Sequence, residues 1–127
     1  PVVGHAFERG FADDHVERLA AYLAEGLGGP AAYTSTFGTG ARVARPHAGN
    51  GVHPDFDDAG IAVFDQAVDA AGIDDPAAAQ ALKDYWAWAT RGPLNDYPDS
   101  MADVPDDEPV HGWGWQGPVT PRSAPSR

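Results

Sequence analysis

Five histidines are the only side chains in this sequence that combine metal ligation with acid–base chemistry near neutral pH. His47 stands out among them because it follows a basic segment, Arg42 to Pro46, and precedes a glycine-rich loop. From such a place an imidazole could project into a pocket and bind a metal. The same features also fit a loop histidine that is exposed or bonded to the backbone. The residues by themselves leave both interpretations open.

His15 is the second candidate. It lies four residues before Leu19 and seven before Tyr22, so the three side chains share one face of a predicted helix. That face could line a cavity, although a histidine at the start of a helix is also commonly a solvated surface residue. The remaining histidines show no spacing typical of zinc ligands and are assigned no role: His5, His53 and His111.

Other catalytic chemistry finds little support in the sequence. There is no cysteine, which excludes disulfides, thiolate metal sites and cysteine nucleophiles. No GxSxG, HExxH, P-loop or dinucleotide-binding glycine pattern is present. The acidic pairs Asp13-Asp14 and Asp57-Asp58 fall at predicted helix starts, where capping and the helix dipole explain them. The histidines therefore remain the main candidates for function.

The charge balance restricts the partners. Nineteen acidic against eight basic side chains give a formal charge of -11, which would repel phosphate backbones and anionic lipid surfaces. Nucleic acid and membrane surfaces are thus not expected as partners. No apolar run reaches the roughly 18 residues that span a bilayer, and no signal peptide is recognisable. We expect a cytoplasmic location.

The elements that must position the histidines are predicted to be helices. An amphipathic helix runs from Asp13 or Asp14 to Leu27, with an aspartate as N-cap and Gly28-Gly29-Pro30 as its stop. The segment between residues 32 and 46 supports at most one or two helical turns before Pro46. His47 would then follow this short helix in a loop.

Two further helices are predicted after that loop. One runs from Phe56 to near Gly72 with Asp55 as its cap, and the other opens at Asp74-Asp75-Pro76 and runs to Gly92. No segment alternates apolar and polar residues as a strand would, so the fold class is all-α. These helices have apolar surface to spare, and a further helix, a ligand or a partner chain such as a second copy would cover it.

The chain divides by composition. At 127 residues and 43% apolar content it suits one domain, which we expect over residues 1–97. Residues 98–127 form an acidic extension rich in proline and tryptophan, predicted to be disordered from about Pro118.

The order of several motifs resembles the truncated globins of group II. A helix ends in Gly28-Gly-Pro-Ala-Ala-Tyr33, His47 follows, and a helix then opens with Asp57-Asp-Ala-Gly-Ile61. The stretches Tyr85-Trp-Ala-Trp-Ala-Thr90, Ala102-Asp-Val-Pro-Asp106 and Trp113-Gly-Trp115 look like the C-terminal region of actinobacterial members. The resemblance implies a 2-on-2 truncated-globin-like fold. It would be incomplete at its N-terminus, since the family's first helices have no counterpart here.

This resemblance implies a cofactor and a site. The cofactor would be haem b (iron protoporphyrin IX), with His47 as the proximal ligand of its iron and His15 at the distal position. The other implied contacts are Leu19 one turn beyond His15, Phe7 packed on the porphyrin, and Tyr33, Arg42 and Arg45 near the propionates. One departure is Gly60, which stands where group II members usually have a tryptophan.

The implied function is that of a haem-binding globin which binds dioxygen or another diatomic ligand such as nitric oxide. NO-detoxifying or peroxidase-like activity would need electrons from an external reductase, so the sequence leaves open whether the chain is an enzyme. The alternative is a degenerate globin-like helical module that binds no haem and acts as an interaction protein.

Overall fold

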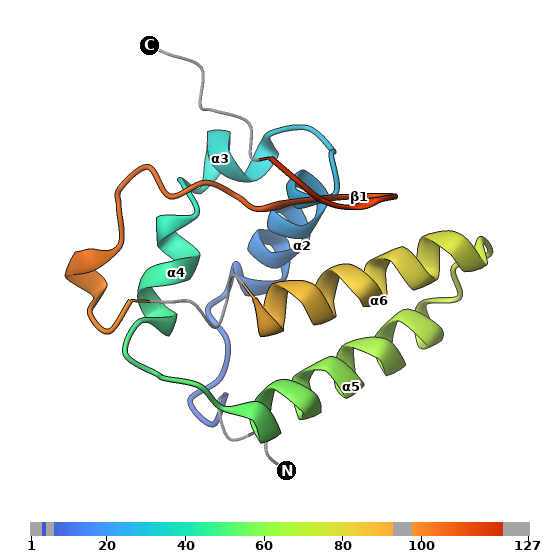
Figure 1. Ribbon diagram of the computed structural model, residues 1–127, viewed down its shortest axis with the longest axis horizontal. Coiled ribbons are helices and arrows are strands. Elements are labelled where there is room, and N and C mark those ends of the chain that lie inside the picture. Colours follow the sequence, from blue (N-terminus) through green and yellow to red (C-terminus); the bar gives the residue numbers. More distant parts are fainter. Residues whose placement is uncertain (1–3, 5–6, 93–97, 121–127) are drawn as a thin grey trace. The chain divides into compact units, whose positions relative to one another are not determined.

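The computed structural model of this protein describes residues 4, 7–92 and 98–120 (Figure 1). The chain forms two compact units. One comprises residues 1–10 and 52–96 and is called here the α5–α6 unit; the other comprises residues 11–51 and 97–127 and is called the α2–α4 unit. The structure is mostly helical, which confirms the all-α class. Within the described residues, no helix has the length and apolar character needed to cross a membrane.

The α5–α6 unit is a helical hairpin of α5 (Pro54–Ala71) and α6 (Pro76–Arg91), which pack side by side (Figure 1). Gly72 ends α5 in the left-handed conformation, with φ 67°, which glycine adopts without strain. The side chain of Asp75 then caps α6 by accepting a hydrogen bond of 2.9 Å from the Ala77 N–H. The end of α5 near Gly72 and the opening of α6 at Asp74-Asp75-Pro76 were both predicted from the sequence. The prediction of Asp55 as the cap of α5 was wrong, because Pro54 occupies the first helical position and His53 is the N-cap.

Aromatic packing and ion pairs join the two helices. The rings of Phe64 and Trp86 stack with centroids 4.5 Å apart and planes inclined by only 6°. Lys83 lies 2.6 Å from Asp69, and Arg91 lies 2.7 Å from Asp58. Because these pairs are exposed, they align the helices more than they stabilise them.

In the α2–α4 unit, α2 (His15–Gly26) packs against α3 (Ala32–Thr36). Asp14 is the N-cap of α2 as predicted, but its side chain makes no capping hydrogen bond and instead lies 3.7 Å from the guanidinium of Arg18. The helix ends before Gly28, whose φ of 90° confirms the predicted stop. At the next helix, Glu25 accepts hydrogen bonds from the Thr34 N–H, at 2.9 Å, and from the Thr34 hydroxyl.

The third helix of this unit, α4 (Ala41–His47), is longer than predicted because it runs through Pro46 instead of ending before it. Proline lacks an N–H and therefore removes one bond of the helical ladder, here the one to Arg42. The ladder resumes immediately, since the N–H of Ala48 donates to the carbonyl oxygen of Ala44 at 3.1 Å. His47 is consequently a helical residue and not a loop residue.

The C-terminal part of the chain packs within the α2–α4 unit. It contains a short 3-10 helix, η1 (Met101–Asp103), and an antiparallel pair of strands, β1 (Gly112–Gly114) and β2 (Gly117–Val119), in which Trp113 pairs with Pro118. The hairpin was not predicted, because three-residue strands of glycine, tryptophan and proline are too short to show alternation. Pro118 and Val119 lie in β2 rather than in the disordered tail that we expected to begin near Pro118.

Candidate functional site

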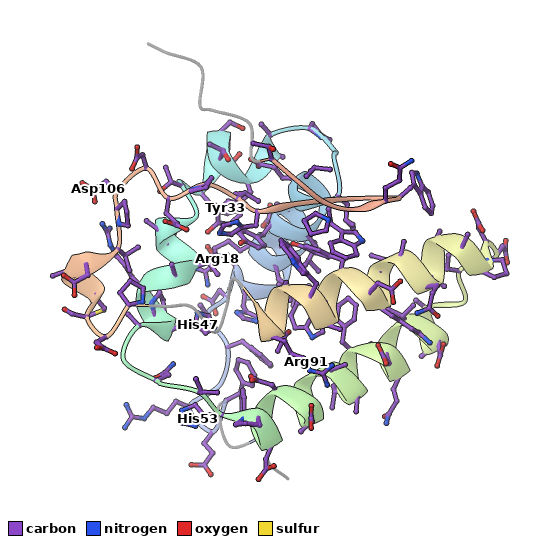
Figure 2. All side chains as sticks on the ribbon, in the orientation of Figure 1. Arg18, Tyr33, His47, His53, Arg91 and Asp106 are labelled. Atoms are coloured by element: carbon purple, nitrogen blue, oxygen red, sulfur yellow. The ribbon has the colours of Figure 1, made fainter. Side chains whose placement is uncertain are left out.

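His47 is the last residue of α4 (Figure 2), and its side chain is exposed. Its Nδ1 atom lies 2.7 Å from the carbonyl oxygen of Val43, one helical turn earlier. A carbonyl oxygen can only accept a hydrogen bond, so Nδ1 must carry the proton that it donates. In the neutral ring the lone pair is then on Nε2, so a metal would bind through Nε2 and not through Nδ1. The backbone of α4 thus selects a metal-binding tautomer of His47.

His15 is the first residue of α2 and belongs to the same unit as His47. Its half-buried ring lies against the ring of Phe11, with centroids 4.6 Å apart and planes inclined by 31°. Leu19 follows one turn later and is 38% exposed, and Val16 is also exposed. The helix therefore presents the imidazole together with exposed apolar side chains. Their contact with water is unfavourable, and an apolar ligand would cover them.

Tyr33 is completely buried in α3, and so it shapes the interior of the unit. Its ring meets Tyr22 edge-on, with centroids 5.1 Å apart, and lies 5.7 Å from the ring of Phe37. Burial raises the pKa of the Tyr33 hydroxyl, and the nearby cations Arg42 and Arg18 oppose that shift.

The two arginines of α4 already have protein partners. Arg42 donates through Nη1 to the carbonyl oxygen of Phe37 at 2.8 Å. Arg45 forms an ion pair with Asp106 and lies 3.4 Å from the carbonyl oxygen of Val104. Both side chains remain at least partly exposed. An anionic group arriving at α4 could therefore reach them, although Arg45 would have to share or exchange its carboxylate partner.

Phe7 belongs to the α5–α6 unit, whereas the other predicted site residues belong to the α2–α4 unit. It stands in a turn in which its N–H donates to Gly4 at 3.1 Å and its carbonyl accepts from Gly10 at 2.8 Å. The side chain is half-exposed. Phe7 is thus an accessible aromatic ring on a turn.

Of the three histidines that were assigned no role, His5 lies outside the residues that the structure describes. His53 is the exposed N-cap residue of α5, and His111 lies 3.3 Å from Glu108. Over residues 7–92 and 98–120, no three histidine, aspartate or glutamate side chains gather closely enough to hold a metal ion.

Sequence reasoning missed two features of the site. The Val43 carbonyl was missed because the helix was predicted to end before Pro46, whereas α4 continues to His47 and brings the carbonyl one turn below the imidazole. The contacts of Arg45 with Val104 and Asp106 could not be predicted, since about sixty residues of chain separate the partners and no local pattern marks them.

These features define an all-α protein in which one unit carries two histidines on different helices, one of them held in a metal-binding tautomer. The chain matches the bacterial-like globin family over residues 4–89 and belongs to that family. All seven predicted site residues fall within the matched region. No curated protein and no solved structure matches the chain. Membership of a globin family implies haem binding in general.

Proposed function

We propose that this protein binds haem b through His47 and takes a diatomic ligand such as dioxygen or nitric oxide. The observation that carries the proposal is the hydrogen bond from His47 Nδ1 to the Val43 carbonyl oxygen, at 2.7 Å. It places the lone pair of the neutral ring on Nε2 and orients the plane of the ring. These are the properties of a proximal haem ligand.

Haem, when bound, supplies an iron whose remaining coordination position is open to a small ligand. His15 is suited to the distal role because a neutral imidazole offers both a donor and an acceptor to a polar diatomic ligand. Its ring packs against the ring of Phe11, with centroids 4.6 Å apart. Leu19 is an exposed apolar group that the porphyrin would cover, and this burial favours binding.

The polar edge of the cofactor would lie among the cations of α4. Arg42 and Arg45 are partly exposed, and a guanidinium pairs well with a carboxylate such as a haem propionate. Tyr33 would support these contacts indirectly. Its ring packs on Phe37, and the Phe37 carbonyl oxygen accepts a hydrogen bond from Arg42.

We further propose that the chain is of the group II truncated type, with the actinobacterial variant of that sequence pattern, and that it works in the cytoplasm. NO-detoxifying or peroxidase-like turnover would require electrons from an external reductase. A homodimer would cover part of the exposed apolar surface. The globin domain would comprise residues 1–97.

The test is a titration of the purified chain with hemin, followed in the visible spectrum. We expect saturable, equimolar uptake with a Soret band in the wild-type chain and in His53→Ala, and loss of specific uptake in His47→Ala. His53 is the matched control because it is also an exposed histidine at a helix end. Equal uptake by the two variants would show that His47 is not the ligand. No uptake by the wild-type chain would favour the haem-free interaction module.

A further inference from the structure

A segment outside the family match lies along the helix that carries His47. We infer that residues 98–109, called here the strap, position α4 and thereby hold His47 in place as a metal ligand. The strap follows the matched region, which ends at residue 89. Figure 2 labels Asp106 on the strap and His47 at the end of α4. The inference rests on the proposed haem-binding role of His47.

The strap is bonded to the chain just before and just after α4. Before the helix, the N–H of Gly40 donates to the carbonyl oxygen of Glu108 at 2.8 Å, and the hydroxyl of Thr39 donates to the carbonyl oxygen of Asp106 at 2.6 Å. After the helix, the N–H of Gly49 donates to the carbonyl oxygen of Pro98 at 3.0 Å. The two ends of the helix are therefore tied to one continuous segment.

Both glycines in these ties are required by geometry. A Cβ atom at Gly40 would clash with the carbonyl oxygen of Pro109. At Gly49 the φ of 78° favours glycine, and a Cβ would lie 3.0 Å from the carbonyl oxygen of Asp99. The strap thus approaches α4 more closely than residues with side chains would allow.

Apolar packing joins the strap to the middle of the helix. Val104 is 4% exposed and forms a buried cluster with Ala41 and Ala44, which lie three residues apart on one face of α4. Beside this cluster, Arg45 forms an ion pair with Asp106 and donates a hydrogen bond to the Val104 carbonyl oxygen. The strap therefore covers one face of α4 along most of its length.

A helix of seven residues has little stability of its own, because forming the first helical turn is costly and few bonds follow. The contacts that keep α4 folded must come from its neighbours, and the strap supplies many of them. Without α4, the Val43 carbonyl would no longer hold the His47 ring. Val104 and Asp106 are accordingly positioning residues for His47.

The first test needs no cofactor. In the full-length chain, Val104→Ala should make the backbone amides of α4 exchange with deuterium about tenfold faster, since two buried methyl groups are lost. Amides of α2 should change less. Val63→Ala is the matched control, because it removes the same groups from an exposed position on α5 and should leave α4 unchanged. If the α4 amides exchange at an unchanged rate in Val104→Ala, the inference that the strap stabilises α4 is wrong.

The second test uses hemin-loaded protein and measures the rate of hemin loss to an excess of a haem-free scavenger globin. Val104→Ala should lose hemin at least several-fold faster than Val63→Ala. Its ferrous nitrosyl spectrum should shift toward the five-coordinate form, which reports a weakened bond from the proximal imidazole. Faster α4 exchange with unchanged hemin loss and an unchanged spectrum would overturn the positioning role.

A surface variant covers the case in which Val104→Ala fails to fold. Asp106→Asn removes the carboxylate partner of Arg45 from an exposed position, with Asp107→Asn as the neighbouring control. Only Asp106→Asn should speed the deuterium exchange of the α4 amides, and equal exchange in the two variants would contradict the inference. If the α4 amides exchange faster in these variants but the wild-type chain takes up no hemin, two conclusions follow. The strap stabilises α4, and the proposed haem-binding function is wrong.

Discussion

His47 Nδ1 lies 2.7 Å from the Val43 carbonyl oxygen, so the proposed ligand is oriented by the helix that carries it. The acceptor is a backbone atom, and no side-chain substitution at Val43 removes it. The orientation of His47 therefore depends on whether α4 is folded, and that depends on what packs against α4. The orientation of the His47 imidazole therefore depends both on a local hydrogen bond and on long-range packing against α4.

A chemical rescue separates ligation by His47 from a structural role. His47→Gly should weaken hemin binding by more than about tenfold, since even loss of a group that only supports a ligand typically costs 10–100-fold in metal affinity. Free imidazole at millimolar concentration should restore the Soret band, because it can enter the space left by the side chain. His53→Gly serves as the control. Failure of imidazole to restore the band would indicate that His47 supports the fold and not the iron.

The cap of α6 makes a prediction about stability. Asp75→Ala should lower the free energy of unfolding by about 1 kcal/mol, because the Ala77 N–H loses its acceptor at 2.9 Å. Asp74→Ala removes the same charge one residue earlier and should have a smaller effect. Urea denaturation followed by circular dichroism gives both values. Equal losses in the two variants would point to charge rather than capping.

Gly60 offers a stabilising change. It lies inside α5 without a positive φ, and a Cβ built there would meet no atom within 4 Å. Gly60→Ala should therefore raise the free energy of unfolding by about 0.5–1 kcal/mol, since alanine loses less backbone entropy in a helix. Thermal unfolding at fixed pH measures the change. A lower melting temperature would mean that the position does not accept a methyl group.

The sequence predicted those elements whose signals are local. Gly72 and Asp75 each act on the nearest turn of helix, so their residue types suffice to place the ends of α5 and α6. The prediction of Asp55 as the cap of α5 failed because it relied on aspartate being a strong capping residue, whereas the proline at position 54 determined where the helix begins.

The C-terminal segment was harder to predict, because its structure depends on distant partners. Val104 is buried only because Ala41 and Ala44 lie against it, and nothing near Val104 in the sequence indicates that contact. For the same reason Arg45 was assigned to the haem propionates without its Asp106 partner. The prediction that His47 and His15 serve haem came from motif order, and the structure adds the Val43 bond and the shared unit.

Alkaline pH should destabilise the α5–α6 unit through Tyr85. Burial raises the pKa of the Tyr85 hydroxyl to about 12, against about 10 in an unfolded chain. The folded state thus favours the neutral phenol, and this contribution to stability is complete below pH of about 10 and is lost as the pH rises toward 12. By pH 11 the loss should be on the order of 1 kcal/mol. Tyr85→Phe keeps the ring without the ionisable group, so urea denaturation at pH 8 and pH 11 should show a smaller loss in the variant. The measurement at pH 8 accounts for any pH-independent contribution of the hydroxyl to stability. If both proteins lose the same free energy of unfolding between pH 8 and pH 11, Tyr85 ionises as readily in the folded chain as in the unfolded one.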